Sequence, residues 1–112
     1  KMNILPLNSE NIVSDNKINF LGNEITFQKT KFEKKNYFLG IRPEHFSVSN
    51  DSEFKFKPKV DLVENLGNEK IVYMSNDNLE LSAKISSQED FQNQINFDSK
   101  DIFIFDENGR RI

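Results

Sequence analysis

The sequence predicts an all-β domain, a small barrel or sandwich with little helix. Several short segments either alternate apolar and polar residues or form brief apolar runs, and both patterns are typical of strands. Only one segment has a composition that suits a helical turn. At 112 residues the chain is long enough for one core and too short for two ordinary domains, so we expect a single domain over 1–112.

The clearest local signal is a β-hairpin near the start of the chain. Residues 18–20 and 25–27 each alternate apolar and polar side chains, and Gly22-Asn23 lies between them. This spacing predicts two strands joined at Gly22-Asn23 by a two-residue turn, which requires positive φ. Further on, residues 79–85 (LELSAKI) place apolar side chains on one face and polar ones on the other, which predicts a strand buried on one side.

Two apolar runs are too short for stable helices and predict buried strands. They are YFLGI at 37–41 and IFIF at 102–105. The segment SSQEDFQNQ, 86–94, has two interpretations: a helix with Ser87 as its cap, or a single turn or loop. The tetrapeptide LGNE occurs at 21–24 and again at 66–69, which we interpret as two similar turns of one β-domain.

The composition indicates a core rich in phenylalanine and excludes several kinds of site. Only 36% of the residues are hydrophobic, but 11 of them are Phe, whose large rings fill a small core efficiently. The absence of Cys excludes disulfides and thiol nucleophiles, and a single His excludes a multi-histidine metal site within the chain. The formal charge of −3 favours neither nucleic acid nor an anionic membrane.

No pattern indicates catalysis by this chain. Its four glycines are isolated, so no phosphate-binding loop of the GxxxxGK[ST] type is present. The sequence has no GxSxG motif, which would supply a nucleophilic serine for His45 to activate. Glu89 and Asp90 are next to each other in a polar stretch, which is typical of a solvated surface. We therefore expect no catalytic residue, no cofactor and no metal site here.

The stretch EFKFKPK, 53–59, has two interpretations. Phe54 and Phe56 beside Lys55 and Lys57 could form a surface that stacks on single-stranded nucleic acid. Alternation along one strand, however, puts the rings and the lysines on opposite faces. The pattern thus favours an edge strand with its rings inward, and we expect no nucleic-acid partner.

The stretch LGIRPEHF, 39–46, predicts a stiff corner. Pro43 restricts Arg42 to extended backbone and fixes its own φ, so a strand that reaches Arg42 must end there. Arg42 and Glu44 would flank this corner, where ion pairing within the domain or to a partner is plausible. The only histidine, His45, follows directly.

Three motifs occur in order along the chain: GIRPEH at 40–45, Leu-Gly-x-Glu at 66–69, and FDSKDIFIFDENGRRI at 97–112. Together they resemble the C-terminal region of ATP-binding subunits of ABC importers of the maltose and sn-glycerol-3-phosphate type. The opening MNIL, 2–5, is similar to the stretch that follows the last helix of the nucleotide-binding domain in that family. Ser99 stands where the family usually has Pro.

The resemblance implies a regulatory domain of oligonucleotide-binding-like (TOBE, MOP-like) character. It implies a nucleotide-binding domain upstream of Lys1, so that the parent subunit binds ATP and Mg and this chain binds neither. The parent would act as a homodimer on membrane permease subunits, at the cytoplasmic face of the inner membrane of a bacterium. Its C-terminal domains would meet near the two-fold axis and could receive a regulatory protein.

The candidate site residues belong to the first two motifs. On this resemblance Arg42 and Glu44 are candidates for ion pairing within the domain or between subunits. We expect Gly67 to occupy a turn with unusual φ, and the Glu69 carboxylate to accept backbone N–H bonds in that turn. The full set of structural or interaction candidates is Arg42, Pro43, Glu44, His45, Gly67 and Glu69.

Two other classes of function stay open. A small oxyanion-binding module would need a cluster of backbone N–H donors with Ser, Thr or Lys at a subunit interface. A binder of single-stranded nucleic acid would need Phe54 and Phe56 exposed beside a basic stripe, and burial of both rings would count against it.

Overall fold

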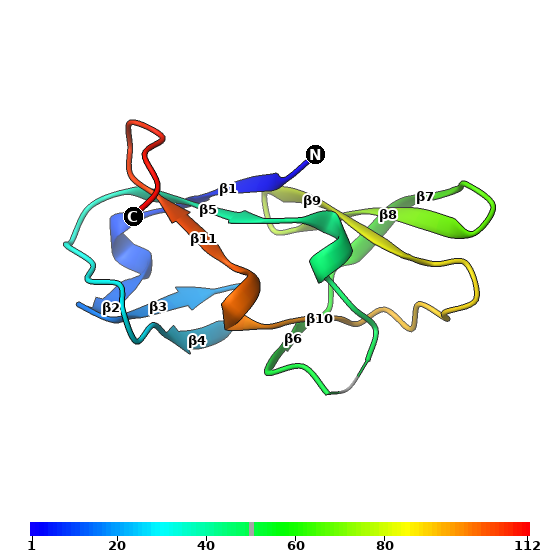
Figure 1. The fold of residues 1–112 in the computed structure, drawn as a ribbon, viewed down its shortest axis with the longest axis horizontal. Coiled ribbons are helices and arrows are strands. Elements are labelled where there is room, and N and C mark those ends of the chain that lie inside the picture. Colours follow the sequence, from blue (N-terminus) through cyan, green and yellow to red (C-terminus); the bar gives the residue numbers. More distant parts are fainter. Residues whose placement is uncertain (50) are drawn as a thin grey trace.

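The strands form four small antiparallel sheets rather than one continuous sheet. The computed structural model of the chain describes residues 1–49 and 51–112, and over these residues it has eleven strands and three 3-10 helices. The sheets, in order of pairing, are β1–β5–β11, β2–β3–β4, β10–β6 and β7–β8–β9 (Figure 1). The predicted all-β class with little helix is therefore confirmed.

The first sheet consists of β1 (Asn3–Leu7), β5 (Tyr37–Ile41) and β11 (Phe103–Phe105). Gly40 in the central strand lies opposite both Ile4 and Phe103. The C-terminal arm folds back along β11, because the Ile112 N–H donates to the Ile104 carbonyl at 3.0 Å. This arm covers part of an otherwise open strand edge.

The second sheet contains the predicted hairpin, with its turn one residue earlier than expected. The strands are β2 (Ile12–Ser14), β3 (Lys17–Phe20) and β4 (Asn23–Thr26). Phe20 pairs with Asn23, so the turn residues are Leu21 (φ 50°) and Gly22 (φ 78°), and the prediction of Gly22-Asn23 was wrong. Asn23 is the first residue of β4. Its side-chain nitrogen donates to the Leu21 carbonyl at 3.1 Å and to the Lys55 carbonyl at 3.0 Å.

The third sheet is the longest and makes the molecule elongated. It comprises β7 (Lys59–Asn65), β8 (Glu69–Asn76) and β9 (Leu79–Ser86), and it extends to one end of the molecule in Figure 1. The longest dimension is 43 Å. The predicted strand 79–85 is β9, and its residues Leu81, Ala83 and Ile85 are buried as expected.

The fourth sheet pairs β6 (Phe54–Phe56) with β10 (Ile95–Phe97). The segment between β9 and β10 is a turn followed by a loop, so the loop interpretation of 86–94 holds and no helix forms there. The three 3-10 helices are short: η1 (Ser9–Asn11), η2 (Pro43–His45) and η3 (Ser99–Asp101).

A cluster of phenylalanine rings lies where these sheets meet. The Phe97 side chain is fully buried. Its ring centroid lies 6.2 Å from those of Phe20 and Phe46 and 6.0 Å from that of Phe56. The ring centroid of Phe54 lies 5.5 Å from that of Phe97. Edge-to-face aromatic contacts add about 0.5–1.5 kcal/mol each beyond the burial of their area. Phe97 thus joins β3, β6, β10 and the segment after η2 in one core.

The two apolar runs form strands, and most of their residues are buried or half-buried. Leu39 and Ile104 point into the core, whereas Phe38 on β5 is 38% exposed and Phe103 and Phe105 on β11 are half-buried. The predicted buried strands are therefore confirmed, with Phe38 as their exposed position. No described strand or helix covers the outer side of this sheet (Figure 1).

Replacing Phe97 by Ala should lower the free energy of unfolding by about 3–5 kcal/mol, because the change leaves a cavity at the meeting point of several elements. Urea unfolding followed by circular dichroism measures this loss. Phe38→Ala is the matched control, and we expect it to cost less than half as much because that ring is exposed. Equal losses in the two variants would show that Phe97 has no special place in the core.

Candidate functional site

The corner 42–45 has the predicted backbone. β5 ends at Ile41, Arg42 is extended (φ −76°, ψ 144°), and Pro43 opens η2 at its first position. Proline suits this position because its fixed φ fits the helix and its missing N–H is not needed there. The His45 N–H donates to the Arg42 carbonyl at 3.0 Å, which closes the turn. η2 packs against β9, so the corner is part of the folded body.

His45 lies toward the third motif. Its Nδ1 atom is 3.7 Å from Oδ1 of Asp101, the last residue of η3. The Nδ1 atom is buried and makes no hydrogen bond in the described part of the chain. At this distance the contact with Asp101 is an electrostatic one between GIRPEH and the C-terminal motif, and it is not a short hydrogen bond.

Arg42 contacts an aromatic ring rather than a carboxylate. Its guanidinium carbon lies 5.8 Å from the centroid of the Phe103 ring, and that of Arg111 lies 4.5 Å from the same centroid. Neither arginine forms an ion pair within the described residues. Within the domain, a cation–π contact with Phe103 takes the place of the ion pair considered for Arg42, and pairing of Arg42 with a partner stays a prediction.

Glu44 also forms no ion pair in the described structure. A hydrogen bond from its own backbone N–H lowers the pKa of its carboxyl group, while burial opposes this effect and the neighbouring His45 and Arg42 add to it. The group therefore stays ionised to lower pH than an ordinary glutamate.

The second motif lies at one end of the molecule, at the β7–β8 turn (Figure 1). Gly67 has φ +91°, which confirms the expected unusual conformation. The role expected for the Glu69 carboxylate was wrong. It forms an ion pair with Lys84 Nζ at 3.3 Å, whereas the Glu69 backbone carbonyl accepts the Leu66 N–H and closes the turn. The six candidate residues thus belong to two separate places.

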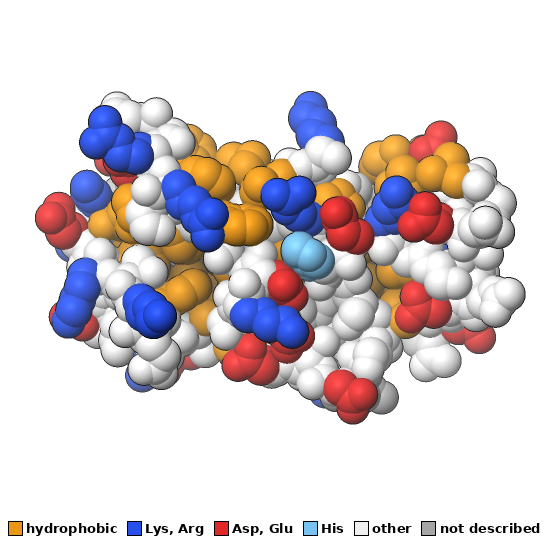
Figure 2. Space-filling view, in the orientation of Figure 1, with side chains coloured by type: hydrophobic (Ala, Val, Ile, Leu, Met, Phe, Trp, Pro, Cys, Tyr) orange, Lys and Arg blue, Asp and Glu red, His pale blue; other side chains and the backbone are white. Residues whose placement is uncertain are grey.

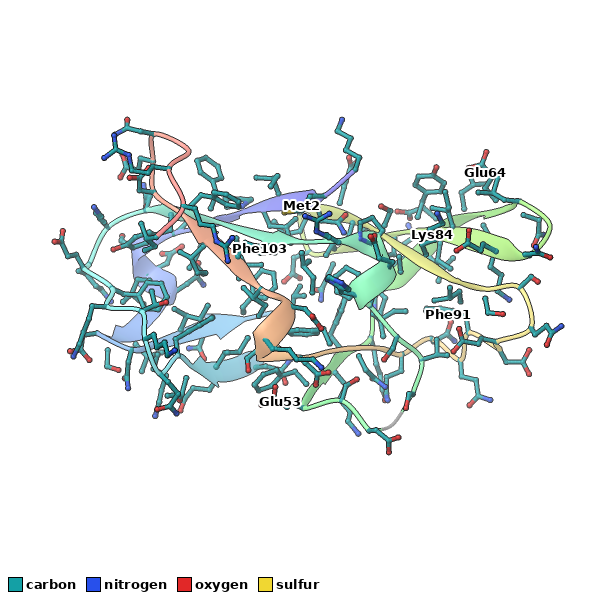
Figure 3. All side chains as sticks on the ribbon, in the orientation of Figure 1. Met2, Glu53, Glu64, Lys84, Phe91 and Phe103 are labelled. Carbon is teal, nitrogen blue, oxygen red and sulfur yellow. The ribbon has the colours of Figure 1, made fainter. Side chains whose placement is uncertain are left out.

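A groove runs between these places along the outer face of β8 and β9. Its volume is about 630 Å³, and Glu44 and Lys84 lie on its walls. Figure 3 shows Lys84 on β9, with Glu64 farther out on the β7–β8 hairpin. The Tyr73 hydroxyl donates to Glu64 Oε1 at 3.2 Å, which raises the pKa of Tyr73 because losing this proton would break the bond beside a negative charge. The remaining lining residues are Lys1, Met2, Asn3, Ile4, Pro43, Ile71, Tyr73, Glu80, Leu81 and Ser82.

Asn3 is an important residue that sequence reasoning missed. Its side-chain nitrogen donates to the carbonyls of Ile41 at 3.1 Å and Ser82 at 2.9 Å, and its oxygen accepts the Ser82 N–H at 2.8 Å. These bonds connect β1, β5 and β9 beside the groove. A signal was present, because Asn3 precedes Leu5 and Leu7 at spacing two and therefore falls on the inward face of the strand.

The Phe54–Lys57 stretch has its rings directed inward. Phe56 is buried, Phe54 is partly buried against the core, and Lys55 and Lys57 are exposed. The prediction of an edge strand with inward rings is confirmed. Because both rings pack on Phe97, they do not provide a stacking surface for single-stranded nucleic acid.

The described residues contain no group of three or more His, Cys, Asp or Glu side chains that could hold a metal ion. Nor does any helix in that part of the chain have the length and apolar character needed to cross a membrane. Comparison with known proteins gives no further information, since no protein-family model and no curated protein matches the chain.

Replacing Gly67 by Ala should destabilise the fold by about 1–2 kcal/mol, because an L side chain is strained at φ +91° even though the space around the position is open. Gly67→Asn should cost less, since Asn tolerates positive φ better. Urea unfolding measures both variants, with Asn68→Ala in the same turn as the control. If Gly67→Ala is as stable as Asn68→Ala, the turn does not have this conformation in solution.

Proposed function

We propose that this chain is the C-terminal regulatory and dimer-contact domain, of TOBE or OB-like character, of the ATP-binding subunit of an ABC importer for sugars or sn-glycerol-3-phosphate. The domain itself carries no catalytic residue, and its parent subunit couples ATP hydrolysis to solute uptake. The parent binds ATP and Mg through a nucleotide-binding domain upstream of Lys1. It acts at the cytoplasmic face of the inner membrane with permease subunits.

The observation that carries the proposal is the meeting of the first and third motifs in space. GIRPEH and the C-terminal motif are more than fifty residues apart in the chain. His45 nevertheless faces Asp101, and Arg42 lies on the ring of Phe103, which Arg111 also contacts. Motifs that are shared across a family for a structural reason are expected to contact one another in this way.

The departure at Ser99 is compatible with this assignment. Ser99 is the first residue of η3, a position at which Pro is favoured because its N–H is dispensable. Here the Ser99 N–H and hydroxyl donate to Glu53 Oε1 at 3.0 and 2.9 Å, and the Glu53 N–H donates to Asp98 at 2.8 Å. Ser99 thus begins the 3-10 helix through its hydrogen bonds to Glu53, whereas in the family the fixed φ of a proline has this role.

As a regulator, the domain would act by binding one state of the ATPase cycle better than another. It can shift the equilibrium between those states only by the difference in its binding free energies. A partner that prefers the open state by about 1.4 kcal/mol would change the ratio of open to closed subunits about tenfold. This mechanism needs a stable surface and no chemistry within the domain.

The test is to clone the natural reading frame upstream of Lys1, purify the longer protein, and compare its ATP hydrolysis and oligomeric state with those of the 112-residue chain. We expect the longer protein to contain a GxxxxGK[ST] loop, to hydrolyse ATP, and to dimerise, while the shorter chain has no activity. A variant of the longer protein with that loop's Lys replaced by Ala is the control for contaminating ATPases.

A reading frame that begins near Lys1 without a nucleotide-binding domain would contradict the proposal. So would a longer protein whose ATP hydrolysis survives the loop substitution unchanged. In either case, binding of small oxyanions becomes the next function to test, by titration with molybdate.

A further inference from the structure

The outer face of the β1–β5–β11 sheet is apolar throughout. Side chains alternate along a strand, so every second residue of these three strands points away from the core. A solvated outer face normally carries polar side chains at those positions. Here Ile4 is 52% exposed, and no position on the strands' outer face is polar. The residues of this apolar face are Met2, Ile4, Pro6, Phe38, Gly40, Phe103 and Phe105.

Gly40 makes this face continuous. A Cβ at Gly40 would lie 2.5 Å from Met2 Sδ and 2.9 Å from a ring carbon of Phe105, both closer than such atoms approach. The absence of a side chain lets Met2, Ile4 and Phe105 pack over the central strand from both sides. Figure 2 shows the resulting band of hydrophobic side chains, and Figure 3 shows Phe103 on β11 and Met2 just before β1.

Two arginines lie next to the apolar face. Arg42 and Arg111 both lie on the Phe103 ring, and neither pairs with a carboxylate in the described structure. The nearby Asp106 carboxylate is already engaged, because it accepts the backbone N–H groups of Asn108 and Arg110 at 2.9 Å. In a chain with a formal charge of −3, two guanidinium groups with no ion-pair partner in the described structure thus lie beside the half-buried Phe103 ring.

We propose that the apolar face, together with Arg42 and Arg111, is a docking surface for a partner protein that presents apolar side chains flanked by carboxylates. Met, Phe and Arg are enriched in protein interfaces, and aromatic rings with adjacent arginines commonly contribute most of the binding energy. The guanidinium groups of Arg42 and Arg111, which form no ion pair in the described structure, complement carboxylates from the partner. The inference rests on this surface alone and does not depend on the importer assignment.

Charge and shape argue against two other occupants. A second copy related by two-fold symmetry would bring the same two arginines to the interface, and the nearby carboxylates, Glu44 and Asp106, already lie beside a positive group or backbone N–H donors of their own copy. A lipid bilayer requires side chains that enter it by about 5–10 Å, whereas the rings of Phe103 and Phe105 lie half-buried on a sheet. An acidic protein segment satisfies both the apolar and the charged parts of the surface.

The experiment is a selection from a phage-displayed random peptide library on the immobilised chain, after depletion on a Phe38→Ser variant. We expect the enriched peptides to carry aromatic or aliphatic residues flanked by Asp or Glu. One enriched peptide is then titrated into ¹⁵N-labelled protein, where the amides of β1, β5 and β11 should shift. Replacing its acidic residues by Asn and Gln should weaken binding about tenfold, as should the double change Arg42→Gln and Arg111→Gln.

Leu62→Ser is the matched control variant, because Leu62 is 60% exposed on β7, outside the apolar face, and its loss should leave peptide binding unchanged. The proposal is overturned if no peptides are enriched, if neutral peptides bind as well, or if the shifts lie on β7–β9. Concentration-dependent dimerisation that Phe38→Ser abolishes would assign the face to a second copy. If the chain binds phosphatidylglycerol vesicles and Phe38→Ser abolishes this binding, the apolar face is assigned to a membrane. If inorganic phosphate shifts the same amides as the peptide does, the face is assigned to a simple anion site.

Discussion

The packing of four phenylalanine rings around Phe97 is the constraint on which the rest of the structure depends. Each of the four sheets has only two or three strands, and sheets of this size are marginal alone. Phe97 contributes a ring that β3, β6 and the segment after η2 all contact. A chain with a modest hydrophobic fraction can therefore form one core, because its aromatic residues converge on one point.

The Asn3 side chain provides the polar counterpart of this cluster. Its three short bonds tie the first strand to Ile41 on one side and to Ser82 on the other, at a position that is 8% exposed. A buried amide in which both groups are satisfied fixes one arrangement of the strands, since any other would leave a donor or acceptor without a partner. The long β7–β9 sheet is held beside β1 and β5 in this way, and the groove between them keeps its shape.

Local chemistry made much of the fold predictable from the sequence. The hairpin at 17–26, the β9 strand and the corner at Pro43 all follow from alternation, turn residues or proline sterics. Contacts between distant residues were not predictable. Nothing in the sequence indicates that Arg42 contacts Phe103 and not a carboxylate, or that Glu69 pairs with Lys84. The short apolar runs predicted buried strands, but periodicity alone did not show that Phe38 stays exposed.

We expect Phe97 and Asn3 to combine the four small sheets into one cooperative unit, which fixes the positions of the corner, the groove and the apolar face. Native-state hydrogen exchange tests it most directly, because it measures the free energy with which each strand opens. The account predicts that slowly exchanging amides of β1, β5, β8, β9 and β10 share a single opening free energy, equal to that of global unfolding. A lower and separate opening free energy for β8 and β9 would contradict it.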